Sequence, residues 1–226
     1  MRMFMVRSVP VTGWSSTEPL NFRPRLQTLL FLSFGLFLFG LGVTLMIASG
    51  LGVPPWTVLA QGLGNHIGAS IGFTTFVVSL FVLIAWIPLR QMPGLGTILN
   101  VIIIATVIEF VLPLLPTLEN TWLKIAGVII GILLVGFGSG LYLVANLGAG
   151  PRDGLMTGLQ RITQLPIAWV RIAIEVSVVL SGWLLGGVVG LGTIMFALGI
   201  GPAVSVGLFL TERFAPETKP SKNETD

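Results

Sequence analysis

The chain has 226 residues, of which 54% are hydrophobic and only 9% are charged, and its mean hydropathy is +0.95. Soluble chains carry about 25% charged residues, so this composition excludes a soluble domain and predicts a protein that lies in a bilayer. The net charge of +3 does not indicate nucleic acid, because the basic residues gather before the first apolar segment and after the last. Flanking basic residues mark the cytoplasmic side of a membrane.

Several kinds of chemistry are excluded by residue counts alone. The chain has no cysteine and a single histidine, His66. Disulfides, thiolate metal sites and cysteine nucleophiles are therefore absent, and a histidine metal site is not expected. The sequence also shows no nucleophile–base pair. We therefore expect no enzymatic activity and no cofactor.

The apolar segments predict six membrane-spanning helices, since one span needs about 20 apolar residues. In chain order they cover residues 26–49, 70–89, 94–115, 122–145, 166–186 and 190–211. Residues 1–25 are expected to form a cytoplasmic N-terminal segment. Residues 212–226 are polar and are expected to form a disordered cytoplasmic tail.

Two further helices are predicted over residues 54–68 and 150–164, and both are too short to span a bilayer. Pro55 and Pro151 suit the first turn of such helices. Each is either an interfacial helix or a half-helix that enters the membrane and lines a cavity. If neither spans, each half of the chain crosses three times and the halves are inverted. If both span, there are eight crossings and the halves are parallel. Their length favours six crossings.

An internal repeat is predicted at an offset of 96 residues. The same five residues, Gly-Leu-Gly-Thr-Ile, occur at 94–98 and 190–194, and Pro55 falls on Pro151 in the same register. Glycine permits a tight entry into a helix, and the threonine can satisfy free N–H groups of the first turn. The predicted fold is therefore an all-α membrane protein with about six transmembrane helices. Its repeats cover residues 26–115 and 116–211 and are expected to be inverted.

Two motifs carry a resemblance to a known family. Residues 50–59, Gly-Leu-Gly-Val-Pro-Pro-Trp-Thr-Val-Leu, and residues 93–100, Pro-Gly-Leu-Gly-Thr-Ile-Leu-Asn, resemble the bacterial YczE/YitT-type membrane protein family. The resemblance covers residues 26 to about 211. It implies a multi-pass protein of the bacterial plasma membrane, and it assigns no substrate or catalytic residue. The terminal basic residues predict that both termini lie in the cytoplasm.

Polar residues within apolar surroundings give the candidate site. Helical spacing places polar residues of each short helix on one face, and ionisable groups in spans usually face the bundle interior. Arg171 and Glu175 are four residues apart, so they form either a structural ion pair or a proton or cation site tuned by the arginine. The candidate cavity-lining residues are Thr57, Gln61, Glu109, Asp153, Thr157, Arg161, Arg171 and Glu175.

The favoured function is that of a small permease or transport-like protein of unknown substrate, because duplication and interrupted helices are typical of transporters. The alternative is a non-transporting scaffold, assembly factor or regulator of another membrane system. The expected partners are the lipid bilayer, a small solute or ion, and a second copy of the chain or another membrane protein. No nucleic acid is expected.

Overall fold

The computed structural model describes residues 9–214, and within this range the chain forms helices and no strand. This confirms the all-α prediction. The helices are α1 (Leu26–Ser49), α2 (Pro55–Ile67), α3 (Ile71–Trp86), α4 (Leu95–Val111), the short 3-10 helix η2 (Leu112–Leu114), α5 (Thr121–Ala145), α6 (Pro151–Thr163), α7 (Ile167–Leu184) and α8 (Leu191–Phe214).

Five of the helices are long and apolar enough to cross a membrane, namely α1, α4 with η2, α5, α7 and α8. A sixth span results if α2 and α3 are taken together, although the two helices meet at an angle of 115°. Helix α6 has 13 residues and does not qualify. The structure thus supports five or six crossings rather than eight, in line with the hydropathy of the sequence.

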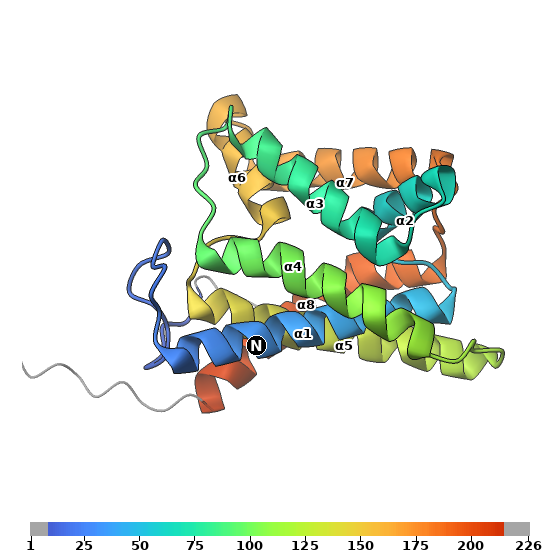
Figure 1. The fold of residues 1–226 in the computed structure, drawn as a ribbon, viewed down its shortest axis with the longest axis horizontal. Coiled ribbons are helices and arrows are strands. Elements are labelled where there is room, and N and C mark those ends of the chain that lie inside the picture. Colours follow the sequence, from blue (N-terminus) through green and yellow to red (C-terminus); the bar gives the residue numbers. More distant parts are fainter. Residues whose placement is uncertain (1–8, 215–226) are drawn as a thin grey trace, which may run out of the picture.

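The helices form two groups (Figure 1). Helices α1, α4, α5 and α8 pack together below, while α2, α3, α6 and α7 lie above them in this view. The lower group holds the larger apolar core, which includes Leu32, Leu36, Ile108 and Val135. The upper group packs around Trp56 and Trp86. Burial of these side chains, together with lipid around the outside, holds the short helices in place.

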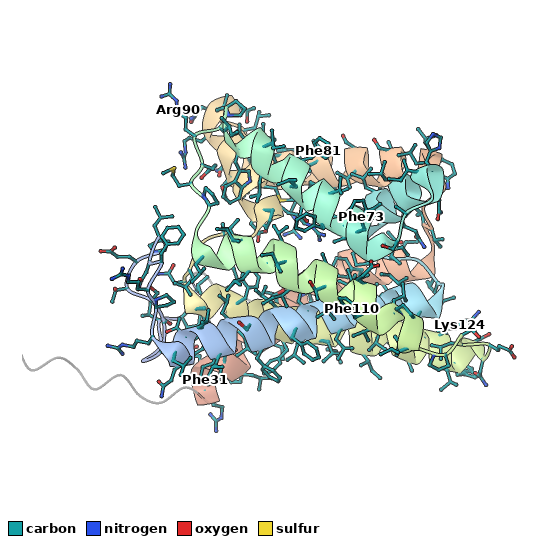
Figure 2. All side chains as sticks on the ribbon, viewed as in Figure 1. Phe31, Phe73, Phe81, Arg90, Phe110 and Lys124 are labelled. Atoms are coloured by element: carbon teal, nitrogen blue, oxygen red, sulfur yellow. The ribbon has the colours of Figure 1, made fainter. Side chains whose placement is uncertain are left out.

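Large apolar side chains cover the exterior of the bundle (Figure 2). Phe73, Phe81 and Phe110 are 54%, 65% and 70% exposed and project from the helices. Outside a membrane such a surface would aggregate, so lipid is its natural environment. The labelled basic residues Arg90 and Lys124 lie at opposite ends of the bundle in Figure 2, beyond this apolar surface.

The helix boundaries recur along the chain. Helices α6, α7 and α8 begin 96 residues after α2, α3 and α4, respectively. The turns that precede the short helices match as well. Gly52 and Gly148, also 96 residues apart, have φ values of +113° and +112°. Only glycine adopts this backbone conformation without strain, and it directs the chain sharply from the end of a long helix into a short one.

Hydrogen bonds between the two halves are reciprocal. The N–H of Gly96 donates to the carbonyl of Leu147 over 2.7 Å, and the N–H of Gly192 donates to that of Leu51 over 2.8 Å. The hydroxyl groups behave alike. Thr97 donates to the carbonyl of Ala149 over 2.6 Å, and Thr193 donates to that of Val53 over 2.9 Å.

The two threonine hydroxyls also accept the N–H groups of Gly94 and Gly190, over 3.2 and 3.3 Å, so the predicted first-turn role of the Gly-Leu-Gly-Thr motif is confirmed. Because each hydroxyl also donates to a carbonyl of the opposite half, the motif links the two halves by hydrogen bonds.

Two close contacts between the halves also correspond, and in each of them a glycine of the second half meets a larger residue of the first half. The indole of Trp86 on α3 fills the space beside Gly154 on α6. In the equivalent contact, Gly182 on α7 lies against the backbone of Val58 on α2. Positions 86 and 182 correspond at an offset of 96 residues, as do 58 and 154. Each interface therefore combines one glycine with one larger residue, which lets the helices approach closely.

The long helices α1 and α4 run opposite to α5 and α8, and the helix pairs α3–α4 and α7–α8 differ in their contact. In Figure 1 the chain passes from left to right along α1 and α4, and from right to left along α5 and α8. Helix α3 packs along α4, whereas the corresponding helices α7 and α8 make almost no contact. Helix α7 has two buried residues, Val170 and Gly182, whereas its counterpart α3 in the first half has six. The second half is therefore the more open one.

Both ends of the described chain extend the bundle. Trp14 is 3% exposed, and its carbonyl accepts the hydroxyl of Thr28, so the segment before α1 is folded onto the bundle. Helix α8 continues to Phe214, past the expected start of the tail at residue 212. Residues 1–8 and 215–226, which hold most of that tail, lie outside the described part.

Candidate functional site

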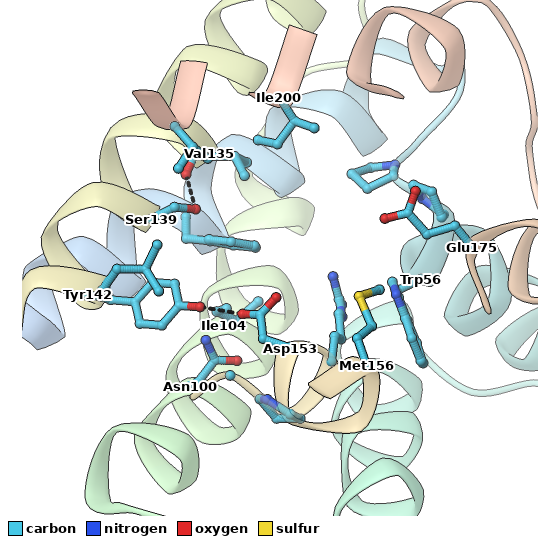
Figure 3. Close-up of a pocket in the computed structure, with 18 of the residues that line it drawn as sticks. Trp56, Asn100, Ile104, Val135, Ser139, Tyr142, Asp153, Met156, Glu175 and Ile200 are labelled. Carbon is cyan, nitrogen blue, oxygen red and sulfur yellow. Dashed lines mark hydrogen bonds between the residues drawn. The ribbon is translucent and has the colours of Figure 1, made fainter. Parts of the chain in front are cut away.

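A cavity of about 270 Å³ lies between the two groups of helices (Figure 3). Its walls come from α1, α4, α5, α7 and α8, and the first turns of both short helices, α2 and α6, close it. Its polar or charged lining residues are Asn100, Ser139, Tyr142, Arg152, Asp153, Arg171 and Glu175, besides the indole of Trp56. The remaining lining is apolar, with Ile104, Met156, Phe196 and Ile200 among its members.

The first turn of α6 supplies two of the charges. Gly150 is the N-cap and Pro151 follows in the first turn, where its missing N–H costs nothing. The indole N–H of Trp86 donates to the Pro151 carbonyl over 2.9 Å and anchors this turn to α3. The carboxylate of Asp153 accepts the hydroxyl of Tyr142 over 2.7 Å, as the dashed line in Figure 3 shows. Asp153 is thereby held at the cavity.

Arg152 points to the other short helix. Its guanidinium carbon lies 5.5 Å from the ring centroid of Trp56, a distance at which a cation and an aromatic face attract each other. Arg152 is half-buried. Among the described residues the only ion pair is that of Arg171 with Glu175, so Arg152 and Asp153, although adjacent in sequence, attract each other without direct contact.

The predicted pair on α7 forms. The Nε of Arg171 donates to Oε1 of Glu175 over 2.9 Å, and their side chains are 54% and 28% exposed. Mutual neutralisation lowers the cost of holding both groups within an apolar helix. Both side chains line the cavity.

Trp56 has an unused hydrogen-bond donor. The residue is 7% exposed, yet its Nε1 has no hydrogen-bond partner among the described residues. The hydroxyl of the neighbouring Thr57, at 1% exposure, is likewise unpartnered. A buried donor without a partner costs about 1–3 kcal/mol. Trp56 lines the cavity, but its Nε1 is itself buried, so a bound acceptor reaches this donor only when the indole ring or its neighbours shift.

Three of the eight residues predicted from the sequence line this cavity: Asp153, Arg171 and Glu175. The other five lie elsewhere. Thr57 is buried behind Trp56. The Gln61 side-chain oxygen accepts the N–H of Val188 over 3.0 Å and so holds the loop before α8.

The remaining three lie on other surfaces of the bundle. Thr157 and Arg161 line a surface hollow at the far end of α6. Glu109 lies between α3 and α4, where its carboxylate accepts the Ser70 hydroxyl over 2.5 Å and the Phe73 N–H over 3.1 Å. It therefore caps the start of α3 instead of facing the cavity.

Sequence reasoning did not assign Tyr142, Arg152, Trp56 or Asn100 to the site. One signal was available. Tyr142 is the only tyrosine of the chain and falls on Met46 at the offset of 96 residues, just as Arg152 falls on Trp56. Polar residues that break the symmetry of two apolar halves therefore mark this cavity. No group of three potential metal ligands occurs within residues 9–214.

The fold and the cavity define a class: a multi-helix integral membrane protein with a polar cavity between its halves. The chain belongs to the family of unknown function DUF6198, whose model matches residues 26–208. It is 43% identical over 208 residues to an uncharacterised protein of Haemophilus influenzae, covering 92% of this chain and 94% of that one.

Two relatives occur in Bacillus subtilis. The uncharacterised membrane protein YczE is 34% identical over 73% of this chain and 77% of its own. The uncharacterised protein YyaS is 27% identical over 79% of this chain and 91% of its own. The resemblance to YczE expected from the two motifs is thus confirmed. No solved structure matches the chain.

Proposed function

We propose that this protein moves a small solute across the bacterial plasma membrane without changing it, and that the solute binds in the cavity between the halves. The observation that carries the proposal is that the two short helices, α2 and α6, both begin at this cavity. Helices that start inside the membrane and point their N-termini at a central site are a recurring feature of transporters.

Duplication with inversion supports this function. The matching helix starts and the reciprocal hydrogen bonds are what two copies related by a two-fold axis would make. The opposite directions of α1 and α5 put that axis across the helices, and hence in the membrane plane (Figure 1). The start of α1 and the end of α8 lie at one end of the bundle, so both termini would face the cytoplasm.

The difference between the halves supports alternating access. Helices α3 and α4 are packed together, whereas the equivalent helices α7 and α8 are separated. If these are two conformations of one unit, packing of α7 on α8 together with separation of α3 from α4 would open the cavity to the other side of the membrane. Gly72 and Glu109 touch in the packed pair. Their equivalents at an offset of 96 residues are Ala168 and Ser205, so these two residues would meet when the second half closes.

Cross-linking tests this exchange. The chain has no native cysteine, so the double variant A168C/S205C in membranes should form a disulfide when oxidised. The control is V176C/F209C, whose equivalents in the first half are Leu80 and Pro113. Leu80 lies farther along α3 and Pro113 lies just beyond the end of α4, in opposite directions from the contact of Gly72 with Glu109. The control should not cross-link. If A168C/S205C fails to cross-link, as the control does, the exchange is wrong.

Transport itself is tested in proteoliposomes. A panel of labelled organic anions, cations, zwitterions and metal ions should contain at least one solute that enters with the reduced A168C/S205C protein and not with the oxidised protein. If no solute of the panel enters with the wild-type protein, the transport proposal is wrong.

One observation favours a second function. Helix α7 packs against α2 and α6, but most of its residues are exposed, and exposed helical surfaces of membrane proteins are where other helices attach. A scaffold or regulator of another membrane system would use that face. Such a protein would support no uptake and would co-purify stoichiometrically with its partner.

A further inference from the structure

We propose that the solute is a zwitterion of about amino-acid size, with its carboxylate at Arg152 and the indole N–H of Trp56 and its cationic group at Asp153. This inference rests on the proposed function, because it takes the cavity as the solute site. Both residue types have the required chemistry: guanidinium and indole N–H groups donate, and a carboxylate accepts.

The anion side rests on two donors that the protein leaves unused. Arg152 forms no ion pair among the described residues, the Trp56 ring accompanies it, and the carboxylates of Asp153 and Glu175 act on it only at longer range. The indole N–H of Trp56 is more than nine-tenths buried and has no acceptor. A buried donor without an acceptor and a half-buried cation without a direct ion pair are both unfavourable, and a bound carboxylate would be favourable for each.

The N-termini of helices α2 and α6 also favour the carboxylate of the ligand. Helices α2 and α6 each have 13 residues and begin with a proline, and the N–H groups that remain free in their first turns are those of Trp56, Arg152 and Asp153. Aligned peptide dipoles make such starts partly positive. Because both starts line the cavity from opposite halves, the field at its centre favours a negative group.

Asp153 supplies the other side. One carboxylate oxygen, Oδ2, accepts the Tyr142 hydroxyl, and no hydrogen bond to the other oxygen exists among the described residues. The second acidic group of the cavity, Glu175, is already paired with Arg171. The cavity therefore keeps one cation and one anion without mutual pairing, Arg152 and Asp153. This separation of charge matches a ligand that carries both signs.

Size and lining agree with an amino acid. A volume of about 270 Å³ corresponds to roughly nine water volumes, and leucine has about as many non-hydrogen atoms. Apolar side chains such as Met156, Phe196 and Ile200 form the rest of the wall and would contact an aliphatic side chain. A purely anionic solute would leave Asp153 beside like charge, which is unfavourable.

Ligand-induced stabilisation of the purified full chain in detergent tests the inference. Three probe pools are compared at millimolar concentration: neutral aliphatic L-amino acids, the same compounds without the amino group, and the same compounds without the carboxylate. Ligands that bind the folded state raise the Tm. We expect the amino-acid pool alone to raise it for the wild-type protein.

Matched variants assign the two ends of the ligand. R152Q and D153N should each weaken amino-acid binding about tenfold or more, as expected for one lost charged hydrogen bond. W56F keeps an aromatic ring but removes the indole N–H, and it should weaken binding several-fold. The control S79A also removes a hydroxyl that donates within its own helix, to the Thr75 carbonyl of α3, but Ser79 does not line the cavity, so affinity should not change.

Other results would overturn the inference. Equal stabilisation by the carboxylate pool, unchanged in D153N, would make this an anion site; equal stabilisation by the amine pool would make it a cation site. No stabilisation by any pool would exclude all three. Should R152Q not fold, R152K, which keeps the charge but not the planar fork, replaces it. Binding of amino acids without uptake would refute transport alone, whereas uptake of another solute without amino-acid binding would refute only this inference.

Discussion

Trp86 occupies the space that a side chain at position 154 would need, because the indole six-membered ring lies directly over Gly154. The same indole donates its N–H to the carbonyl of Pro151, so one aromatic residue of α3 fixes both the side and the start of α6. The first turn of α6 carries Arg152 and Asp153. The position of the candidate site therefore depends on this contact.

We expect G154A to destabilise the protein by about 2 kcal/mol, since overfilling a packed contact costs roughly 1–3 kcal/mol. The matched control is G201A in α8, where no atom lies within 4 Å of an added Cβ. That change should be neutral or slightly stabilising, because alanine favours helix over glycine. Thermal unfolding in detergent measures both. Equal Tm values for the two variants would show that Trp86 can move aside.

Thr97 and Thr193 should contribute equally to stability. Each hydroxyl accepts an N–H of its own motif and donates to a carbonyl of the opposite half. T97V and T193V should therefore each cost about 1–2 kcal/mol. The double variant should be additive, because the sites share no hydrogen-bond partner.

The control for these changes is T44V, whose buried hydroxyl only donates to the Gly40 carbonyl within α1; its cost should be smaller. Denaturant or thermal unfolding compares the four proteins. A large cost for one threonine and none for the other would count against two structurally equivalent halves.

Glu109 should tolerate loss of its charge but not loss of its oxygens. Its carboxylate accepts the Ser70 hydroxyl and the Phe73 N–H at the start of α3. In E109Q the amide oxygen can still accept, so the loss of stability should be below that of E109V. We expect about 1–2 kcal/mol for E109V, which leaves the Ser70 hydroxyl without its acceptor, whereas the Phe73 N–H still donates to Oγ of Ser70 over 3.3 Å. Stability of both variants is read from unfolding in detergent.

Amino-acid binding by E109Q should remain at the wild-type level, because Glu109 does not line the cavity. If E109Q kept its stability and yet lost binding, Glu109 would act in the site rather than as a cap.

Accessibility labelling should place the connections after α2 and after α3 on opposite sides of the membrane. Ile67 and Met92 are 54% and 71% exposed, so single cysteines there are reachable. In intact cells an impermeant maleimide should label I67C, whereas M92C should react only after the membrane is opened. Position 68 is avoided because Gly68 has a φ of +69°. Labelling of M92C in intact cells would reverse the proposed orientation.

Much of the fold was predictable because one physical variable controls it. Apolar segments of about 20 residues must span, and segments of about 14 cannot. Hydropathy therefore places α1 and α5 to within a residue. The starts of α2 and α6 follow from Pro55 and Pro151, which favour the first turn. The angle of 115° between α2 and α3 depends on tertiary packing, so no local pattern predicts it.

The candidate site was predictable only in part. Asp153, Arg171 and Glu175 stand out because charges in apolar surroundings are costly. Thr157 and Arg161 share a face with Asp153, but α6 lines the cavity only as far as Met156. A helix rises 1.5 Å per residue, so they lie roughly 6 and 12 Å farther along than Asp153. Trp56 and Tyr142 resemble ordinary apolar core residues in sequence. Their role depends on which donors and acceptors remain unpaired after folding.

The first half carries the larger residues Val58 and Trp86, and the second half carries glycine at the equivalent positions 154 and 182. This difference limits how the protein could be assembled. Two copies of the first half alone would set tryptophan against valine at both interfaces, which overfills them. Two copies of the second half would set glycine against glycine, which leaves voids. Neither half can therefore replace its counterpart as a symmetric homodimer. Whatever its origin, the chain now needs both halves joined, and a change on one side of either interface requires a compensating change on the other.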